Sequence, residues 1–136
     1  MQLSVIVATF QGCSFEHLND KGRFEWAIKA GVEAGGFTLL HQHIHAFDPQ
    51  GVTGSAVLAE SHINLHSWPE NGCLFVDIAT CGDAAATQRA FDAIAKIFSP
   101  TKIEHRNLNY ATEPTPDVPL QSTWCTNDNA DGPPPH

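Results

Sequence analysis

The sequence has few basic residues and no long apolar run. Its 136 residues hold seven Lys and Arg against fifteen Asp and Glu, which gives a formal net charge of −8. A surface this acidic argues against nucleic acid or an anionic membrane as the partner, and it tolerates a cationic ligand. No apolar stretch approaches the roughly 20 residues of a membrane-spanning helix, and no basic-then-apolar leader opens the sequence. We therefore expect a small soluble protein that binds neither nucleic acid nor membrane.

Cysteine is scarce as well. The four cysteines form no CxxC pair and no dense framework of the secreted type (Cys13, Cys73, Cys81 and Cys125). Disulfides belong to oxidising compartments, so this pattern favours free thiols in a reducing cytosol. We expect a cytoplasmic protein.

Basic residues stop at Arg106, and prolines become frequent soon after it. Residues 111–136 contain six of the nine prolines and no Lys or Arg. Proline interrupts helices and central strands, so this tail is expected to wrap the surface or to be disordered. We find no internal repeat, and we expect residues 1–110 to form the one folded domain.

Within residues 1–110, strand and helix patterns follow one another. Asp20 and Asp83 are suited to cap two helices, which Gly35-Gly36 and Ser99-Pro100 end. Strand patterns cover residues 3–8, 37–47, 55–65, 73–80 and 102–110. The order β-α-β-β-β-α-β predicts an α+β fold of two layers, a mostly antiparallel sheet with both helices on one face. The face left uncovered predicts a homodimer in which two sheets pair as an αββα sandwich.

Residues capable of chemistry gather between residues 51 and 82. This stretch holds the carboxylate–hydroxyl pair Glu60-Ser61, two histidines (His62 and His66), Glu70 in a turn and Cys81 before a glycine. Each has an ordinary structural explanation when taken singly, since a cysteine at a strand end is usually a small buried apolar residue. Their combination and spacing are what indicate a site.

Five short sequence segments contain these residues and the neighbours that set their spacing. They are residues 45–52 (HAFDPQGV), 51–54 (GVTG), 60–62 (ESH), 66–70 (HSWPE) and 77–82 (DIATCG). In register and without a gap, they resemble the prokaryotic S-adenosylmethionine decarboxylase proenzymes, a pyruvoyl-dependent family. The order of strands and helices around them fits that family too.

The resemblance implies that the chain cuts itself between Glu60 and Ser61. In this family the serine hydroxyl attacks the preceding carbonyl, and elimination then leaves a pyruvoyl group at the start of the second chain. The expected cofactor is therefore a covalent pyruvoyl group made from Ser61. It condenses with the substrate amine and takes up the electrons released with CO₂. The implied activity converts S-adenosylmethionine to the aminopropyl donor of spermidine synthesis.

The resemblance also assigns roles to single residues. His66 matches the histidine of processing and catalysis, and Cys81 matches the residue that returns a proton to the decarboxylated carbon. Thr53 stands where many members have a serine whose hydroxyl assists processing. Phe47 matches an aromatic that stacks on adenine, and Glu70 matches a carboxylate that accepts hydrogen bonds from ribose hydroxyls.

Strand alternation conflicts with a site confined to one chain. Counted from Ser61, alternation puts Ile63 and Leu65 on the same face and His66 on the opposite one. Either the strand bends or bulges here, or the site is shared across a homodimer interface, as it usually is in this family. We favour the shared site.

Two other functions remain open. Some relatives on this scaffold decarboxylate arginine or ornithine, and Asp48, beside Phe47, has the charge to pair with such a substrate. A chain that folds and dimerises without cleaving would instead be a binding subunit. The presence of Ser61, His66 and Cys81 together argues against that function.

Three histidines occupy alternate positions of one expected strand, His41, His43 and His45. Imidazoles bind zinc, but three in a flat row, each about 6.6–6.8 Å from the next, rarely hold one ion. We expect no metal site.

Overall fold

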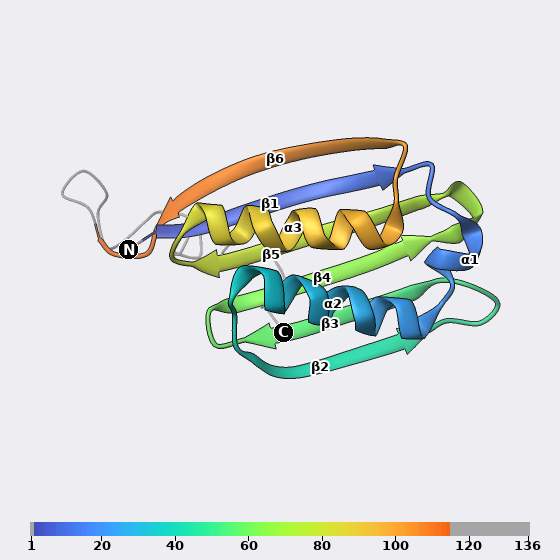
Figure 1. Cartoon of the computed structure of the whole chain (residues 1–136), viewed down its shortest axis with the longest axis horizontal. Coiled ribbons are helices and arrows are strands. Elements are labelled where there is room, and N and C mark those ends of the chain that lie inside the picture. The colour runs from blue at the N-terminus through green and yellow to red at the C-terminus, as the bar shows by residue number, and fades with distance from the viewer. Residues whose placement is uncertain (1, 115–136) are drawn as a thin grey trace, which may run out of the picture.

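The structure, a computed structural model, describes residues 2–114. Its strands are β1 (Gln2–Gln11), β2 (Leu39–Ala46), β3 (Val52–Leu58), β4 (Ser61–Trp68), β5 (Cys73–Cys81) and β6 (Lys102–Ala111). Its helices are α1 (Phe15–Leu18), α2 (Lys21–Gly35) and α3 (Ala84–Phe98), with a single 3₁₀ turn, η1 (Pro69–Asn71). Within this part of the chain the strands form one sheet in the order β2-β3-β4-β5-β1-β6, antiparallel throughout. Helices α2 and α3 lie side by side across one face (Figure 1), so the predicted two-layer α+β fold is confirmed.

Both long helices begin and end where the sequence predicts. Asp20 caps α2 by accepting a 3.0 Å hydrogen bond from the Gly22 N–H, and Asp83 caps α3 by accepting one of 2.9 Å from the Ala85 N–H. Gly36 ends α2 in the left-handed conformation at φ 70°, which glycine adopts without steric cost. The caps satisfy backbone groups that have no partner inside a helix.

The hydrophobic core lies between the two helices and the sheet. Two edge-to-face ring pairs pack within it: Phe10 of β1 meets Phe91 of α3 at 5.4 Å, and Phe24 of α2 meets Phe98 of α3 at 5.2 Å between centroids. Burying one such side chain contributes about 1.5–3 kcal/mol. The largest fully buried side chains are Phe10, Phe24, Phe98, Leu18, Ile28, Ile63, Leu65, Leu74, Ile78, Ile94, Val52 and Val76.

The face of the sheet opposite α2 and α3, here called the open face, has no other element of the described residues packed over it. It carries the strand residues that alternate with the core positions. Some of them are large and apolar, such as Val57 and Trp68, which are 50% and 41% exposed. The predicted uncovered face is therefore present, whereas the pairing of two such faces in a dimer stays a prediction.

One predicted strand is wrong. Residues 55–65, expected as one continuous strand, form a hairpin in which β3 ends at Leu58, Ala59 and Glu60 turn, and β4 begins at Ser61. The turn contains none of the Gly, Asn or Asp residues that usually mark a two-residue hairpin. Apolar residues lie on both sides of the turn with no turn-forming residue between them, so no sequence signal marks the break. The turn coincides with the expected cleavage site.

The predicted tail, residues 111–136, lies outside the described residues from position 115 onward. None of the helices among residues 2–114 is long and apolar enough to cross a membrane.

Candidate active site

The peptide bond between Glu60 and Ser61 is held in an unusual conformation at one end of the β3–β4 hairpin. Ser61 has φ 149°, a region that residues with a side chain seldom adopt and that costs on the order of 1–3 kcal/mol. The carbonyl oxygen of Glu60 accepts a 2.9 Å hydrogen bond from the N–H of Cys81. The side-chain carboxylate of Glu60 accepts a second hydrogen bond, also of 2.9 Å, from the N–H of Thr38. This peptide is therefore both strained and fixed in place.

Cys81 stands next to that peptide because β5 pairs with β4. Ser61 lies opposite Thr80 in this pairing, and Cys81, the last residue of β5, follows at once. The Thr80 side chain is fully buried, and its hydroxyl shares a 2.7 Å hydrogen bond with that of Thr87 on α3. This buried contact anchors the end of β5 and so keeps Cys81 next to Glu60 and Ser61.

A chain of polar side chains on the open face ends next to the Ser61 hydroxyl. The Ser61 hydroxyl lies 3.3 Å from His62 Nδ1, and His62 Nε2 lies 3.3 Å from Asp77 Oδ2. Asn64 donates a 3.2 Å hydrogen bond from Nδ2 to the same carboxylate oxygen, and its Oδ1 accepts one of 2.7 Å from Ser55. Neither His62 nor Asp77 was assigned a role from the sequence. The sequence alone could not show that these two residues meet, since their contact depends on the register of β4 against β5.

A second cluster occupies the opposite end of the hairpin. Thr53 Oγ1 and His66 Nδ1 share a 2.5 Å hydrogen bond across β3 and β4. The His66 ring meets Trp68 at 4.5 Å and Phe47 at 6.0 Å between centroids, both edge-on. Glu70, in the turn after β4, accepts a 3.0 Å hydrogen bond from Gln50 Nε2. Phe47 is exposed, so an aromatic ring and a carboxylate are available to a ligand at this end.

The predicted site residues therefore fall into two groups that one chain does not bring together. Glu60, Ser61 and Cys81 form the cleavage-end cluster, while Phe47, Thr53, His66 and Glu70 form the aromatic-end cluster. Ser61 and His66 are five residues apart on one strand, about 16 Å at about 3.3 Å per residue. The strand between them is regular, with Ile63 and Leu65 buried and His66 on the open face. The expected conflict of faces is real, and the strand does not bend to remove it.

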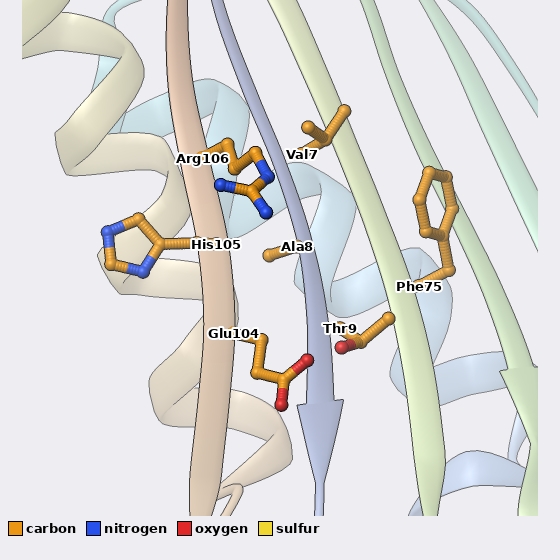
Figure 2. A pocket seen from close by; sticks show the side chains of 7 residues that line it. All are labelled: Val7, Ala8, Thr9, Phe75, Glu104, His105 and Arg106. Carbon is orange, nitrogen blue, oxygen red and sulfur yellow. The ribbon is translucent and has the colours of Figure 1, made fainter.

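A hollow on the open face lies outside both clusters. It is lined by residues of β1, β5 and β6 (Val7, Ala8, Thr9, Phe75, Glu104, His105 and Arg106). Figure 2 shows Glu104 and Arg106 reaching from β6 over β1 on the side of Thr9 and Phe75, while His105 projects away from them. None of the predicted site residues lines this hollow. Among the described residues no group of three or more His, Cys, Asp or Glu side chains is placed to hold a metal ion.

The fold and these clusters define a class: a two-layer α+β protein with a strained carboxylate–serine turn, and with imidazole, thiol and aromatic side chains beside its sheet. Comparison with known proteins identifies the family. The profile described as S-adenosylmethionine decarboxylase matches residues 4–110. The chain belongs to the S-adenosylmethionine decarboxylase family, and both the resemblance and the enzyme class expected from the sequence are confirmed.

Known proteins of several organisms are similar to this chain. An S-adenosylmethionine decarboxylase proenzyme of Picrophilus torridus is 33% identical over 113 residues, which cover 83% of this chain and 87% of that one. A proenzyme of the same name from Methanococcus maripaludis is 41% identical over 99 residues, covering 73% and 81%. The crystal structure of the adenosylmethionine decarboxylase from Aquifex aeolicus superposes with a TM-score of 0.77 at 29% identity, covering 88% of this chain and 95% of that one.

Proposed function

We propose that this chain is a proenzyme that cuts itself between Glu60 and Ser61 and then decarboxylates S-adenosylmethionine through a covalent pyruvoyl group. The observation that carries the proposal is the peptide at the β3–β4 turn. Ser61 has φ 149°, and the carbonyl oxygen of Glu60 is hydrogen-bonded to the Cys81 N–H. Strain raises the energy of the uncut bond, and an N–H aimed at the carbonyl oxygen stabilises the negative charge that attack places there.

Cleavage begins with the Ser61 hydroxyl. Its oxygen bonds to the carbonyl carbon of Glu60, the C–N bond breaks, and the hydroxyl proton ends on the freed amine, which leaves an ester. A base then removes the α-proton of Ser61, and the Cβ–Oγ bond breaks to release the Glu60 carboxylate. The dehydroalanine that remains takes up water, loses ammonia and becomes the pyruvoyl group.

The residues present fit a pyruvoyl group formed at this position. Ser61 supplies all the carbon atoms of that group. Cys81 lies on the adjacent strand, and its backbone N–H already donates a hydrogen bond to the Glu60 carbonyl. The group supplies an electrophilic carbonyl that no ordinary side chain offers, and with it a place for the electrons released with CO₂. Cys81 is suited to hold the proton that the substrate carbon receives, and His66 is suited to transfer protons near neutral pH.

The nucleoside of the substrate is proposed to bind at the aromatic-end cluster. An adenine ring stacks well on an exposed aromatic side chain such as Phe47, and a carboxylate such as Glu70 accepts hydrogen bonds from ribose hydroxyls. The sulfonium charge suits a protein with a formal net charge of −8. The product would be the aminopropyl donor for spermidine synthesis.

The separation of the two clusters supports a shared site in a homodimer. Both clusters lie at opposite ends of the same hairpin, beside an open face that carries exposed Val57 and Trp68. A two-fold axis through that face would pair the cleavage end of one protomer with the aromatic end of its partner, and would do so twice. The paired sheets would form the αββα sandwich expected from the sequence. We place this dimer in the cytoplasm, in keeping with the free thiols of Cys13, Cys73 and Cys81.

Intact mass of the purified protein tests the proposed cleavage. The expected result is two chains, residues 1–60 and 61–136, with the second lighter by one ammonia than the same chain beginning with serine. An uncut chain after prolonged incubation at neutral pH would overturn the proposal in favour of a binding subunit.

Mixed dimers test the shared site. Co-expression of Ser61→Ala and Phe47→Ala chains gives heterodimers in which one of the two sites is intact. At low substrate concentration the mixture should regain about a quarter of wild-type activity, since half of the dimers are mixed and each holds one good site. Activity no higher than that of the two variants kept separate would show that each chain holds its own complete site.

A further inference from the structure

The geometry points to His62 as a catalytic residue of self-cleavage, with Asp77 as the residue that positions it; we propose that His62 Nδ1 takes the hydroxyl proton of Ser61 in the first step. This inference rests on the proposed cleavage between Glu60 and Ser61. The resemblance gives His66 a part in processing without saying which residue takes the hydroxyl proton of Ser61, and the inference goes further in naming His62 for that step.

The hydrogen bonds around His62 fix which of its nitrogens is free. An ionised carboxylate only accepts hydrogen bonds, so the ring nitrogen facing Asp77, Nε2 at 3.3 Å, carries the hydrogen. Nδ1 then keeps its lone pair, and this is the atom that lies 3.3 Å from the Ser61 hydroxyl. The tautomer selected by Asp77 is thus the one that can accept a proton from Ser61.

The carboxylate that selects this tautomer is itself held. Asn64 donates to Asp77 Oδ2 at 3.2 Å, and the Asn64 carbonyl accepts a 2.7 Å hydrogen bond from Ser55. On the other side of β5 the residue opposite Asp77 is Val7, an apolar neighbour. The Asp77 side chain is 24% exposed and that of His62 is 39% exposed. The pair is therefore partly withdrawn from water, and its orientation depends on a fixed set of neighbours.

The other histidine of this strand is engaged elsewhere. His66 shares a hydrogen bond with Thr53 at the far end of β4, about 16 Å along the strand from Ser61. Within one chain, among the described residues, His62 is the histidine whose ring lies within hydrogen-bond distance of Ser61. The two histidines can then act at different steps, with His62 in the attack on the carbonyl.

The proposed step balances without an outside reactant. The Ser61 oxygen bonds to the carbonyl carbon of Glu60 while its proton passes to His62 Nδ1. The negative charge on the carbonyl oxygen faces the Cys81 N–H, which already donates to it at 2.9 Å. As the C–N bond breaks, His62 returns the proton to the departing nitrogen of Ser61. The products are the ester and a free amine, with His62 restored.

The decisive variants keep the shape of the site and remove proton transfer. In His62→Asn the amide occupies the place of Nδ1 and can still bond to the hydroxyl, but it cannot take a proton. Asp77→Asn keeps an acceptor for Asn64 and no longer fixes the His62 tautomer. His105→Gln is the matched control, a histidine of β6 whose ring contacts Phe91 on the helix side of the sheet. Each is purified as the full chain, and the cleavage half-time is followed by intact mass.

We expect His62→Asn to slow cleavage about 10²–10⁴-fold, the usual contribution of a positioned acid–base group. Asp77→Asn should slow it at least about tenfold, and added to His62→Asn it should cost little more, because it acts through the ring. Wild type and His105→Gln should cleave alike. A His62→Asn chain that melts like wild type and cleaves at the wild-type rate would overturn the proposal. If the slowing caused by each single variant multiplies in the double variant, Asp77 does not act through His62 and its role is only structural.

Hydroxylamine separates the two steps of cleavage, since at neutral pH it cuts esters much faster than amides; intact masses distinguish a cut at Glu60-Ser61 from one at Asn71-Gly72, a peptide bond that hydroxylamine can also cut. Because His62 is assigned to ester formation, the His62→Asn chain should stay whole in hydroxylamine. Fragments 1–60 and 61–136 from that chain would place His62 in the elimination step and overturn the assignment. If His62→Asn fails to fold, Asp77→Asn carries the same test. A wild-type chain that stays uncut would refute the proposed function itself, which distinguishes the two failures.

Discussion

The backbone N–H of Cys81 donates a 2.9 Å hydrogen bond to the carbonyl oxygen of Glu60, so the residue expected to supply a proton in turnover already touches the bond expected to break. The contact belongs to the β4–β5 pairing, in which Ser61 lies opposite Thr80. Because the hydrogen bond comes from the backbone, it survives replacement of Cys81 by any residue except proline. Cleavage and turnover are thereby open to separate experiments.

Replacing Ser61 should abolish cleavage. In Ser61→Ala no oxygen remains to attack the Glu60 carbonyl, and the chain should stay whole. Ser14→Ala is a suitable control, since Ser14 caps the short helix α1 and lies outside both clusters. Denaturing gels and intact mass after incubation at neutral pH make the comparison. Two fragments from Ser61→Ala would show that another residue supplies the nucleophile.

Replacing Cys81 should leave cleavage and impair turnover. Cys81→Ala keeps the N–H that holds the Glu60 carbonyl, so a processed enzyme should still form. Loss of a positioned proton donor should then lower kcat about 10²–10⁴-fold. Cys73→Ala, at the opposite end of β5, is the matched thiol control. Normal kcat in processed Cys81→Ala would mean that the proton comes from elsewhere.

The sequence predicts the fold well where local signals agree. The caps Asp20 and Asp83 and the stop at Gly36 are found as expected, because each works through its immediate neighbours. The turn at Ala59 and Glu60 was missed, because apolar residues lie on both sides of it and no turn-forming residue marks it. That turn forms against local preference, as φ 149° at Ser61 shows, and sites under such strain are where local rules fail.

Only part of the candidate site could be predicted from the sequence, for a related reason. The motif locates Ser61, His66 and Cys81 in the sequence, but contact between residues follows from strand register. The register sets His62 beside Asp77 and keeps His66 with Thr53. Alternation was enough to show that Ser61 and His66 face apart. It was not enough to find the side chain that stands next to Ser61.

The thiol of Cys13 should react slowly in the folded protein. Burial raises the pKa of Cys13 from 9.0 to about 11, with a smaller contribution from nearby Cys73. The thiolate is the reactive form, and a rise of about two units leaves about 100-fold less of it at pH 8. Iodoacetamide labelling followed by peptide mass mapping should show that protection, and unfolding in guanidinium should remove it. Equal labelling rates in the folded and unfolded chain would show that Cys13 is not buried.

Phe47 should matter for substrate binding and little for self-cleavage. The ring is 46% exposed and packs edge-on against His45 and His66, which leaves a face for adenine. Stacking of this kind is worth about 1–3 kcal/mol, so Phe47→Ala should raise KM for S-adenosylmethionine about 5- to 150-fold. Trp26→Ala is the control, since Trp26 is an exposed aromatic on α2, away from the open face. An unchanged KM in Phe47→Ala would show that the adenine does not bind at this end of the sheet.

The same assay decides between substrates. S-adenosylmethionine, ornithine and arginine are all cationic, so the acidic surface does not separate them, and Asp48 stands exposed beside Phe47 where it can pair with an ammonium or guanidinium group. Only S-adenosylmethionine presents an adenine and a ribose to Phe47 and Glu70, and we expect CO₂ release from it alone when each substrate carries a labelled carboxyl group. Asp48→Asn should then change KM by no more than about fivefold, since an exposed charge pair contributes about 0–1 kcal/mol. CO₂ from ornithine or arginine, with none from S-adenosylmethionine, would reverse the assignment, and a large rise of KM in Asp48→Asn would identify the residue responsible.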